Sequence, residues 1–301
     1  MKILIGIDGS EHSFAAASLA GRLLAHGRDQ IALYHSCGPL TLADQVDSSL
    51  HERACQAVAN VILDEAKRRL PQPLQADVEA FQGDGRAAEA IVEQAQRWGA
   101  ELIVLGARGL GRMEGLLLGS VSSSVVRTAH VPVLVARGNH DEAEALRVLI
   151  AYDPVHAAQH ADFIGKLTWP EGAVGRVAAV IDSMLPSHLP EWIQKRARDA
   201  DTEAMSQVWV REHEQARKAK EQELASYTQR LPGPFRSSAP IVLEGNPAEQ
   251  LMALVDREKP SIIVMGKAMK NFFDRWFIGS VSEKVLAHAG CSVLVIPAGK
   301  G

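Results

Sequence analysis

Cysteine, aromatic residues and long apolar runs are all scarce in this sequence. The 301 residues include three cysteines, Cys37, Cys55 and Cys291, an odd number without C-x-x-C spacing. This pattern argues against a disulfide framework or a zinc site. We expect the three cysteines to act as small apolar side chains in a protein of a reducing compartment. No run reaches ~18 apolar residues and the first residues lack a signal-peptide pattern, so we expect a cytoplasmic protein that does not span a membrane.

The chain also lacks a strong charge of either sign. Its formal net charge is -4, so the basic surface of a nucleic-acid binder is not expected. Apolar residues make up 47% and charged residues 23%, which is ordinary for a globular protein. The eleven histidines form no convincing ligand set, so no metal site is expected. Because domains usually hold ~100–200 residues, the length predicts two of them.

What the sequence does contain is an internal repeat. The segment 101–136 matches the segment 261–297, with Gly106 corresponding to Gly266 and Gly119 to Gly279, and the offset between them stays constant. The start of the chain, KILIGIDGS, matches RVLIAYDPV at residues 147–155 with a smaller offset. Roughly 15 extra residues therefore belong to the first half of the second copy. We expect domains at residues 1–138 and 146–301, joined by the polar stretch near 137–145.

Each copy predicts alternating strands and helices. Continuously apolar segments such as LIVL and VPVLV suit strands covered by helices on both faces, and the alternation predicts a parallel, doubly wound sheet. In the first copy we expect strands at residues 2–8, 30–36, 78–82, 101–105 and 131–136, and helices at 10–25, 41–70, 87–98 and 120–129. In the second copy we expect a strand at 148–152, a helix at 157–167, a strand at 176–181 and a long helical insert within 186–231.

A glycine-rich path follows the fourth expected strand of the first copy. Gly106 and Gly109 end the strand, and Gly119 begins a helix nine residues later. Glycine tolerates a positive φ and lets backbone N–H groups approach an anion, and a helix N-terminus favours phosphate. The path matches neither the P-loop nor the dinucleotide-binding pattern. Side chains that add hydroxyl groups or positive charge are those of Arg108, Arg112, Ser120 and Ser122.

The pattern G-x2-G-x9-G-[ST], in a domain that begins ILIGIDGS and contains ELIVLG, GSVSSSVVRTA and VPVLV, resembles the universal stress protein family. The resemblance covers both copies. It implies two tandem doubly wound α/β domains, each with a five-stranded parallel sheet in the order 3-2-1-4-5 flanked by helices. It also implies that the first copy binds ATP, with or without Mg²⁺. The matching binding positions are Ile7, Asp8, Ser36, Gly106, Arg108, Gly109, Gly119, Ser120, Val121 and Ser122.

Two parts of this interpretation leave alternatives open. Asp8 can hold a nucleotide, or it can be a turn or helix-capping residue. In the second copy Met269 replaces the second glycine and Pro154 removes a backbone donor, so we doubt that it binds a nucleotide, although Lys267 and Lys270 could attract phosphate. The aromatic residues near that loop suit packing or a partner surface: Phe272, Phe273, Trp276 and Phe277.

Three classes of function follow. The first is an ATP-binding universal stress protein that serves the stress response through a protein partner not identifiable from the sequence. The second is an interaction scaffold that binds no nucleotide. The third is an enzyme, at most a slow ATPase, since no acid–base pair or positioned nucleophile is visible beside the loop. Because an unpaired apolar edge is an aggregation hazard, we expect strands 131–135 and 292–296 to pair as an internal pseudo-dimer. Further association of two chains as a homodimer is left as an open alternative.

Overall fold

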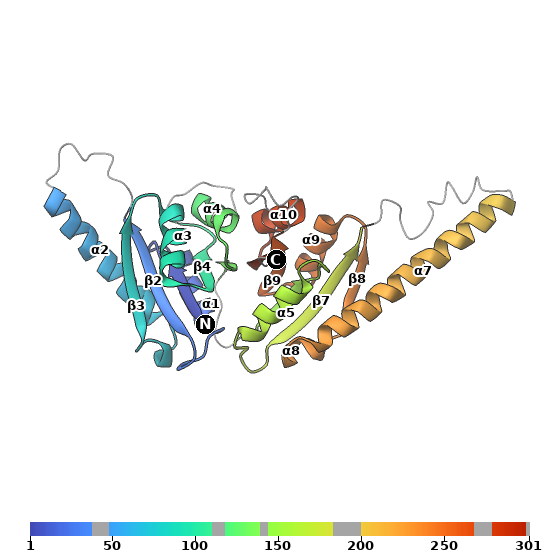
Figure 1. The fold of residues 1–301 in the computed structure, drawn as a ribbon, viewed down its shortest axis with the longest axis horizontal. Helices are drawn as coiled ribbons and strands as arrows, with labels where there is room; N and C mark the ends of the chain where they lie inside the picture. The colour runs from blue at the N-terminus through green and yellow to red at the C-terminus, as the bar shows by residue number, and fades with distance from the viewer. Residues whose placement is uncertain (38–47, 110–117, 139–143, 183–199, 268–278, 299–301) are drawn as a thin grey trace.

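The computed structural model describes residues 1–37, 48–109, 118–138, 144–182, 200–267 and 279–298, without the side chains of 48–51, 200–207 and 209. One ten-stranded sheet runs through this part of the chain, with helices on both faces (Figure 1). The elements of the first half are β1 (Lys2–Gly6), α1 (Glu11–Gly21), β2 (Gln30–Cys37), α2 (Ser48–Arg68), a 3-10 turn (Gln72–Leu74), β3 (Val78–Asp84), α3 (Ala87–Trp98), β4 (Leu102–Gly106), α4 (Ser120–Thr128) and β5 (Val133–Ala136).

The second half repeats this order. Its elements are β6 (Arg147–Ala151), α5 (Ala157–Lys166), β7 (Val174–Ile181), α7 (Ala200–Gln229), α8 (Gly233–Arg236), β8 (Ile241–Glu244), α9 (Pro247–Glu258), β9 (Ile262–Lys267), α10 (Ser280–His288) and β10 (Ser292–Pro297). Helix α7 joins β7 to β8 just as α2 joins β2 to β3, and it is the longer of the two helices, with 30 residues against 21. The expected linker falls partly outside the described residues, since 139–143 are not described.

The strand order is β3-β2-β1-β4-β5-β10-β9-β6-β7-β8. Within each half the order is therefore third, second, first, fourth, fifth, and the paired neighbours are parallel. The expected doubly wound order is confirmed in both halves. Strands β1 and β4 are neighbours. From β1 the chain continues to β2 and β3 on one side, and from β4 it continues to β5 on the other side. The carboxyl ends of β1 and β4 are therefore the switch point of the first half.

The two halves join through antiparallel pairing of β5 with β10. Leu134 lies opposite Leu294, and Val135 and Val133 lie opposite Val293 and Val295. Because residues 134 and 294 are equivalent in the repeat, the register is symmetric about this pair, as in an interface between two identical subunits. The predicted internal pseudo-dimer is thus confirmed, and neither of these two apolar strands is left as an open edge.

Two apolar layers cover the two faces of the sheet. One layer packs α1, α2, α5, α7 and α8 against the sheet, and the other packs α3, α4, α9 and α10. Both layers run across the β5–β10 junction: Leu134 and Leu294 belong to the first, and Val135 and Val293 to the second. The junction therefore buries apolar surface on both faces and does not depend on backbone pairing alone.

Local sequence signals explain several element boundaries. Ser10 is the N-cap of α1, and its hydroxyl accepts a hydrogen bond from the Ser13 N–H. Gly99 ends α3 in a left-handed conformation with φ of 74°. Helix α1 ends at Gly21, earlier than the expected residue 25. The expected start of the long first-half helix at Thr41 lies outside the described residues.

Two buried cations cross between the halves. Arg137, expected to begin a polar linker, is 7% exposed and donates from its guanidinium to the carbonyls of Leu286 and Cys291 near the end of α10. In the opposite direction Lys267 is 5% exposed and donates from Nζ to the carbonyl of Arg127 in α4. Each half thus supplies a cation to a helix C-terminus of the other, where positive charge is favourable. The polar stretch near 137–145 therefore begins with a residue that is buried in the junction.

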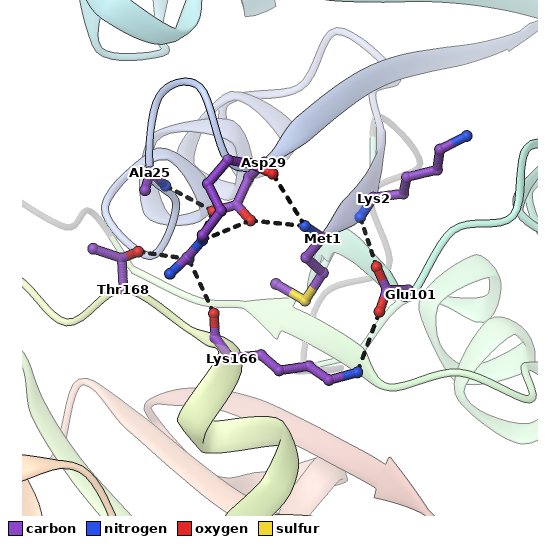
Figure 2. Close-up of polar contacts among 8 residues, drawn as sticks. Met1, Lys2, Ala25, Asp29, Glu101, Lys166 and Thr168 are labelled. Carbon is purple, nitrogen blue, oxygen red and sulfur yellow. Dashed lines mark hydrogen bonds and ion pairs between the residues drawn. The ribbon is translucent and has the colours of Figure 1, made fainter.

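A second contact joins the halves near the start of the chain (Figure 2). The guanidinium of Arg28 donates to the carbonyl of Lys166 at 3.0 Å and to Thr168 Oγ1 at 2.7 Å. Asp29 holds this guanidinium through an ion pair of 2.9 Å, and Glu101 pairs with Lys166 Nζ at 3.2 Å. Burial works to raise the pKa of Asp29, but hydrogen bonds from Arg28 and the Ala25 N–H outweigh it and lower that pKa. These contacts lie apart from the β5–β10 junction and restrict rotation about it.

Candidate functional site

The candidate site begins where β1 and β4, the first and fourth strands of the first half, end side by side. Gly6 of β1 lies opposite Leu105 of β4, so the residues that follow both strands emerge side by side. Ile7 remains attached to β2, because its N–H donates to the Tyr34 carbonyl at 2.8 Å. The Ile7 carbonyl in turn lies 2.7 Å from Nδ1 of His35. The predicted residues Ile7 and Asp8 therefore lie at the switch point, directly after the end of β1.

Asp8 both shapes a turn and faces the glycine loop. Its Oδ1 accepts hydrogen bonds from the Ser10 N–H at 3.0 Å and the Ser10 hydroxyl at 2.6 Å. Gly9 makes the turn possible with φ of 88°, a conformation that side-chain-bearing residues rarely adopt. Oδ2 lies against Gly109, where a Cβ atom would overlap it. The turn reading of Asp8 is therefore confirmed, and the same carboxylate also lies at the predicted site.

Glycine is required in the loop for close approach. A Cβ on Gly106 would lie 2.6 Å from the carbonyl carbon of His12 and 2.8 Å from the Ser13 nitrogen, both backbone atoms of α1. Neither Gly106 nor Gly109 has a positive φ, so the expected use of that conformation does not occur. These glycines instead bring the loop directly onto the start of α1 and onto Asp8.

The loop closes on itself at the start of α4. The Gly119 N–H donates to the Ala107 carbonyl at 2.6 Å, which holds the two ends of the loop together. Gly119 is the N-cap of α4 and provides no side-chain cap. The first-turn N–H groups of Ser120, Val121 and Ser122 therefore have no partner within the helix, as at any helix start. Residues 110–117, which include Arg112, lie outside the described part of the chain.

The two predicted serine hydroxyls of this loop differ in role. Ser122 is 4% exposed, and its hydroxyl donates to the Gly106 carbonyl at 2.6 Å. Ser282 forms the same bond with Gly266 in the second half, at 2.7 Å. The Ser122 hydroxyl thus ties α4 to β4, and what it can offer an anion is its backbone N–H. Ser120 lies exposed at the first position of the helix.

Positive charge lies on one side of the loop. Arg108 is exposed, and its carbonyl accepts a bond of 3.4 Å from the Ser10 hydroxyl. Burial lowers the pKa of the Arg137 guanidinium, and the positive charge of Arg108 lowers it further, so these two cations act on one another. Their combined field favours an anion beside the loop.

Ser36 completes the set from the neighbouring strand. It is the second-last residue of β2, and its hydroxyl is buried beside the hydroxyl of Tyr34. All ten predicted residues therefore lie at or just after the carboxyl ends of β1, β2 and β4, or at the start of α4. A hollow of about 220 Å³ at the other end of β2, lined in part by Arg28, Asp29 and Asp77, is unrelated to this edge.

The equivalent edge of the second half has different chemistry. Asp153 Oδ2 lies 2.8 Å from Nδ1 of His156, which holds the pKa of Asp153 below its ordinary value. The His156 ring is 3% exposed and lies 2.7 Å from where a Cβ of Gly266 would be. Lys267, expected as an attractor of phosphate, is instead buried in the contact with α4, and burial lowers its pKa to about 8. Met269, Lys270 and the aromatic residues 272–277 lie outside the described residues.

The described residues hold neither a membrane helix nor a metal cluster. None of their helices is long and apolar enough to cross a bilayer. Nor do they bring together three or more His, Cys, Asp or Glu side chains able to hold a metal ion.

The fold and the loop define a class of tandem α/β proteins with a glycine loop at the switch point. A sequence profile described as the universal stress protein family matches residues 1–137 and 192–297, and the chain belongs to that family. It is 25% identical over 308 residues to a universal stress protein of Mycolicibacterium smegmatis, covering 98% of this chain and 96% of the relative.

Other relatives match one copy or the whole fold. A universal stress protein of Thermus aquaticus is 35% identical over 147 residues, covering 45% of this chain and 97% of its own length. The crystal structure of a universal stress protein from Archaeoglobus fulgidus DSM 4304 aligns over 99% of this chain and 98% of its own, with a TM-score of 0.65 at 20% identity. That structural likeness concerns the fold alone.

Proposed function

We propose that the first half binds one ATP, with or without Mg²⁺, at the edge formed by Asp8, Ser36 and the loop from Gly106 to Ser122. The observation that carries this proposal is the approach of Gly109 to Asp8, which leaves no room for a side chain between the loop and the turn. Such backbone exposure beside a helix N-terminus is the arrangement that receives phosphate. Arg108 adds positive charge there.

The role of each element follows from its chemistry. The first-turn N–H groups of α4 and the loop backbone bind the phosphates, while Asp8 and the end of β2 bind the nucleoside. Binding shifts the conformation of the first half, and a protein partner in the stress response recognises the shifted form. The second half supports the first through the β5–β10 junction. We place no ATP there because His156 lies over Gly266 and Lys267 is buried.

The test begins with the purified full chain. Denaturation followed by chromatography identifies any nucleotide carried through purification, and calorimetric titration of nucleotide-free protein measures ATP, ADP and adenosine in parallel. We expect one ATP per chain, bound more tightly than adenosine because the loop contacts phosphate. Absence of binding at millimolar ATP would exclude this function and favour the interaction scaffold, in which both loops serve as protein surfaces.

A further inference from the structure

Two of the three cysteines meet at the edge that forms the proposed site. Cys37 is the last residue of β2, directly after Ser36, and lies opposite Asp84 of β3. Cys55 lies on α2, the helix that follows. Although 17 residues separate them in sequence, the path of α2 over the sheet brings the two thiols to the same place, and the Cys55 thiol raises the pKa of Cys37. Both side chains are partly exposed, so small solutes can reach them.

The orientation of α2 explains this contact. Ala59 is fully buried and Leu63 is 4% exposed, which marks the face of α2 that packs on the sheet. Cys55 lies one turn before Ala59 on that face, since residues four apart share a side of a helix. The helix runs back along the sheet, so its earlier turns cover the carboxyl ends of the strands. Ile62 confirms the placement, because its side chain lies 3.2 Å from where a Cβ of Gly9 would be.

The local environment keeps the pair reduced under ordinary conditions. Burial, followed by the neighbouring Cys55 thiol and the charge of Asp84, raises the pKa of Cys37 to about 11. Cys37 is therefore protonated near neutral pH and reacts slowly as a nucleophile. A disulfide needs sulfur atoms ~2.05 Å apart, so the two thiols must approach one another to form it.

We infer that Cys37 and Cys55 are a redox-responsive pair, which a peroxide converts to a disulfide linking β2 to α2 beside the nucleotide edge. The Cys55 thiolate attacks the peroxide O–O bond, giving a sulfenic acid and, for hydrogen peroxide, water. The Cys37 sulfur then displaces the sulfenic oxygen and forms the S–S bond, with release of a second water. Two thiols and one hydrogen peroxide thus give one disulfide and two waters. A cellular dithiol reverses the change.

The consequence for ligand binding rests on the proposed function. Forming the S–S bond draws the start of α2 toward the end of β2, where Ser36 lies and where Ile62 covers the turn at Gly9. This movement narrows the edge expected to receive the nucleoside. We expect the oxidised protein to bind ATP about tenfold more weakly than the reduced protein, and dithiothreitol to restore the affinity.

The decisive experiment treats the full chain with millimolar hydrogen peroxide under native conditions, followed by non-reducing proteolysis and mass spectrometry. We expect a peptide pair linked through Cys37 and Cys55, lighter by two hydrogens. Cys37→Ser and Cys55→Ser should lose this product, while the matched control Cys291→Ser, which changes a buried cysteine elsewhere, should retain it. ATP titration before and after oxidation, with Cys55→Ser as the insensitive control, gives the second measurement.

The outcomes separate this inference from the proposed function. If native protein yields no Cys37–Cys55 product, the redox pair is refuted whether or not ATP binds. A disulfide that leaves the ATP affinity unchanged would refute its effect on the site. If the reduced protein binds no ATP, the proposed function fails, while the mass spectra still decide whether the disulfide forms.

Discussion

Gly109 faces the carboxylate of Asp8 so closely that a Cβ atom at position 109 would overlap Oδ2 of Asp8. This contact joins the two segments predicted to hold a nucleotide. It also explains why a glycine is needed at a position without a positive φ. Met269 occupies the equivalent position of the repeat, so the second copy itself suggests the substitution that tests the contact.

Gly109→Met should weaken ATP binding by about a hundredfold or more, equivalent to roughly 2.7 kcal/mol, because the side chain displaces the loop from Asp8. Isothermal titration calorimetry measures the effect. Gly165→Met is the matched control, since Gly165 is exposed on α5 with open space around its Cβ position. Undiminished affinity in Gly109→Met would place the site elsewhere.

Ser122→Ala should lower the free energy of unfolding by about 1 kcal/mol and leave ATP affinity within about twofold, because the hydroxyl bonds to the Gly106 carbonyl. Ser282→Ala removes the same bond from the second half and should cost a similar amount. Urea denaturation and ATP titration of both variants test this. A large loss of affinity in Ser122→Ala alone would show that its hydroxyl contacts the ligand.

Arg137→Leu should lower the free energy of unfolding by about 2–4 kcal/mol, because the carbonyls of Leu286 and Cys291 lose a buried, charged donor. Arg97→Leu is the control: Arg97 is largely exposed, and its ion pair with Glu93 lies on the surface of α3. Urea denaturation of both variants is the measurement. Equal stability of the two would mean that the cation contributes nothing to the junction.

His160 predicts a loss of stability in acid. It is fully buried, neither ring nitrogen has a hydrogen-bond partner among the described residues, and burial followed by the charge of His156 lowers its pKa to about 4, against the opposing effect of Asp153. The unfolded chain, with a histidine pKa near 6.5, therefore binds the proton more readily. The contribution of neutral His160 to the free energy of unfolding is fully present above about pH 6.5, and it falls by up to about 3 kcal/mol as the pH drops toward 4.

His160→Leu should remove that part of the acid loss, because an apolar side chain of similar size has no proton to bind. Chemical denaturation at a series of pH values between 7 and 4 measures it. His130→Leu, at an exposed position, should keep the wild-type pH profile. An unchanged profile in His160→Leu would assign the acid sensitivity to other groups.

Much of the fold could be predicted from the sequence. The apolar runs LIVL and VPVLV identified β4 and β5, and the α3 bounds were predicted at Ala87 and Trp98 as observed. The internal repeat indicated two similar halves, and the family resemblance supplied the strand order within each half. Strand β8 and helix α9 received no prediction, because the short run Ile241–Glu244 and its flanks give a weak signal.

The directions of side chains at the site were harder to predict. Two signals were nevertheless available. Ser282 persists in the copy whose loop has lost a glycine, which indicates a structural role for Ser122. Arg137 continues the alternation of Val133 and Val135, so it points to the face where α10 packs. The direction of Lys267 depends on how the two halves dock, and no pattern within one copy records that.

The symmetric pairing of β5 with β10 within one chain has a further consequence. A noncovalent pair of separate subunits comes apart on dilution and exchanges members, whereas this pair is tethered and keeps its effective concentration at any dilution. Identical subunits also share every substitution. Here a change in one half has no counterpart in the other, so the sequences of the two halves can change separately.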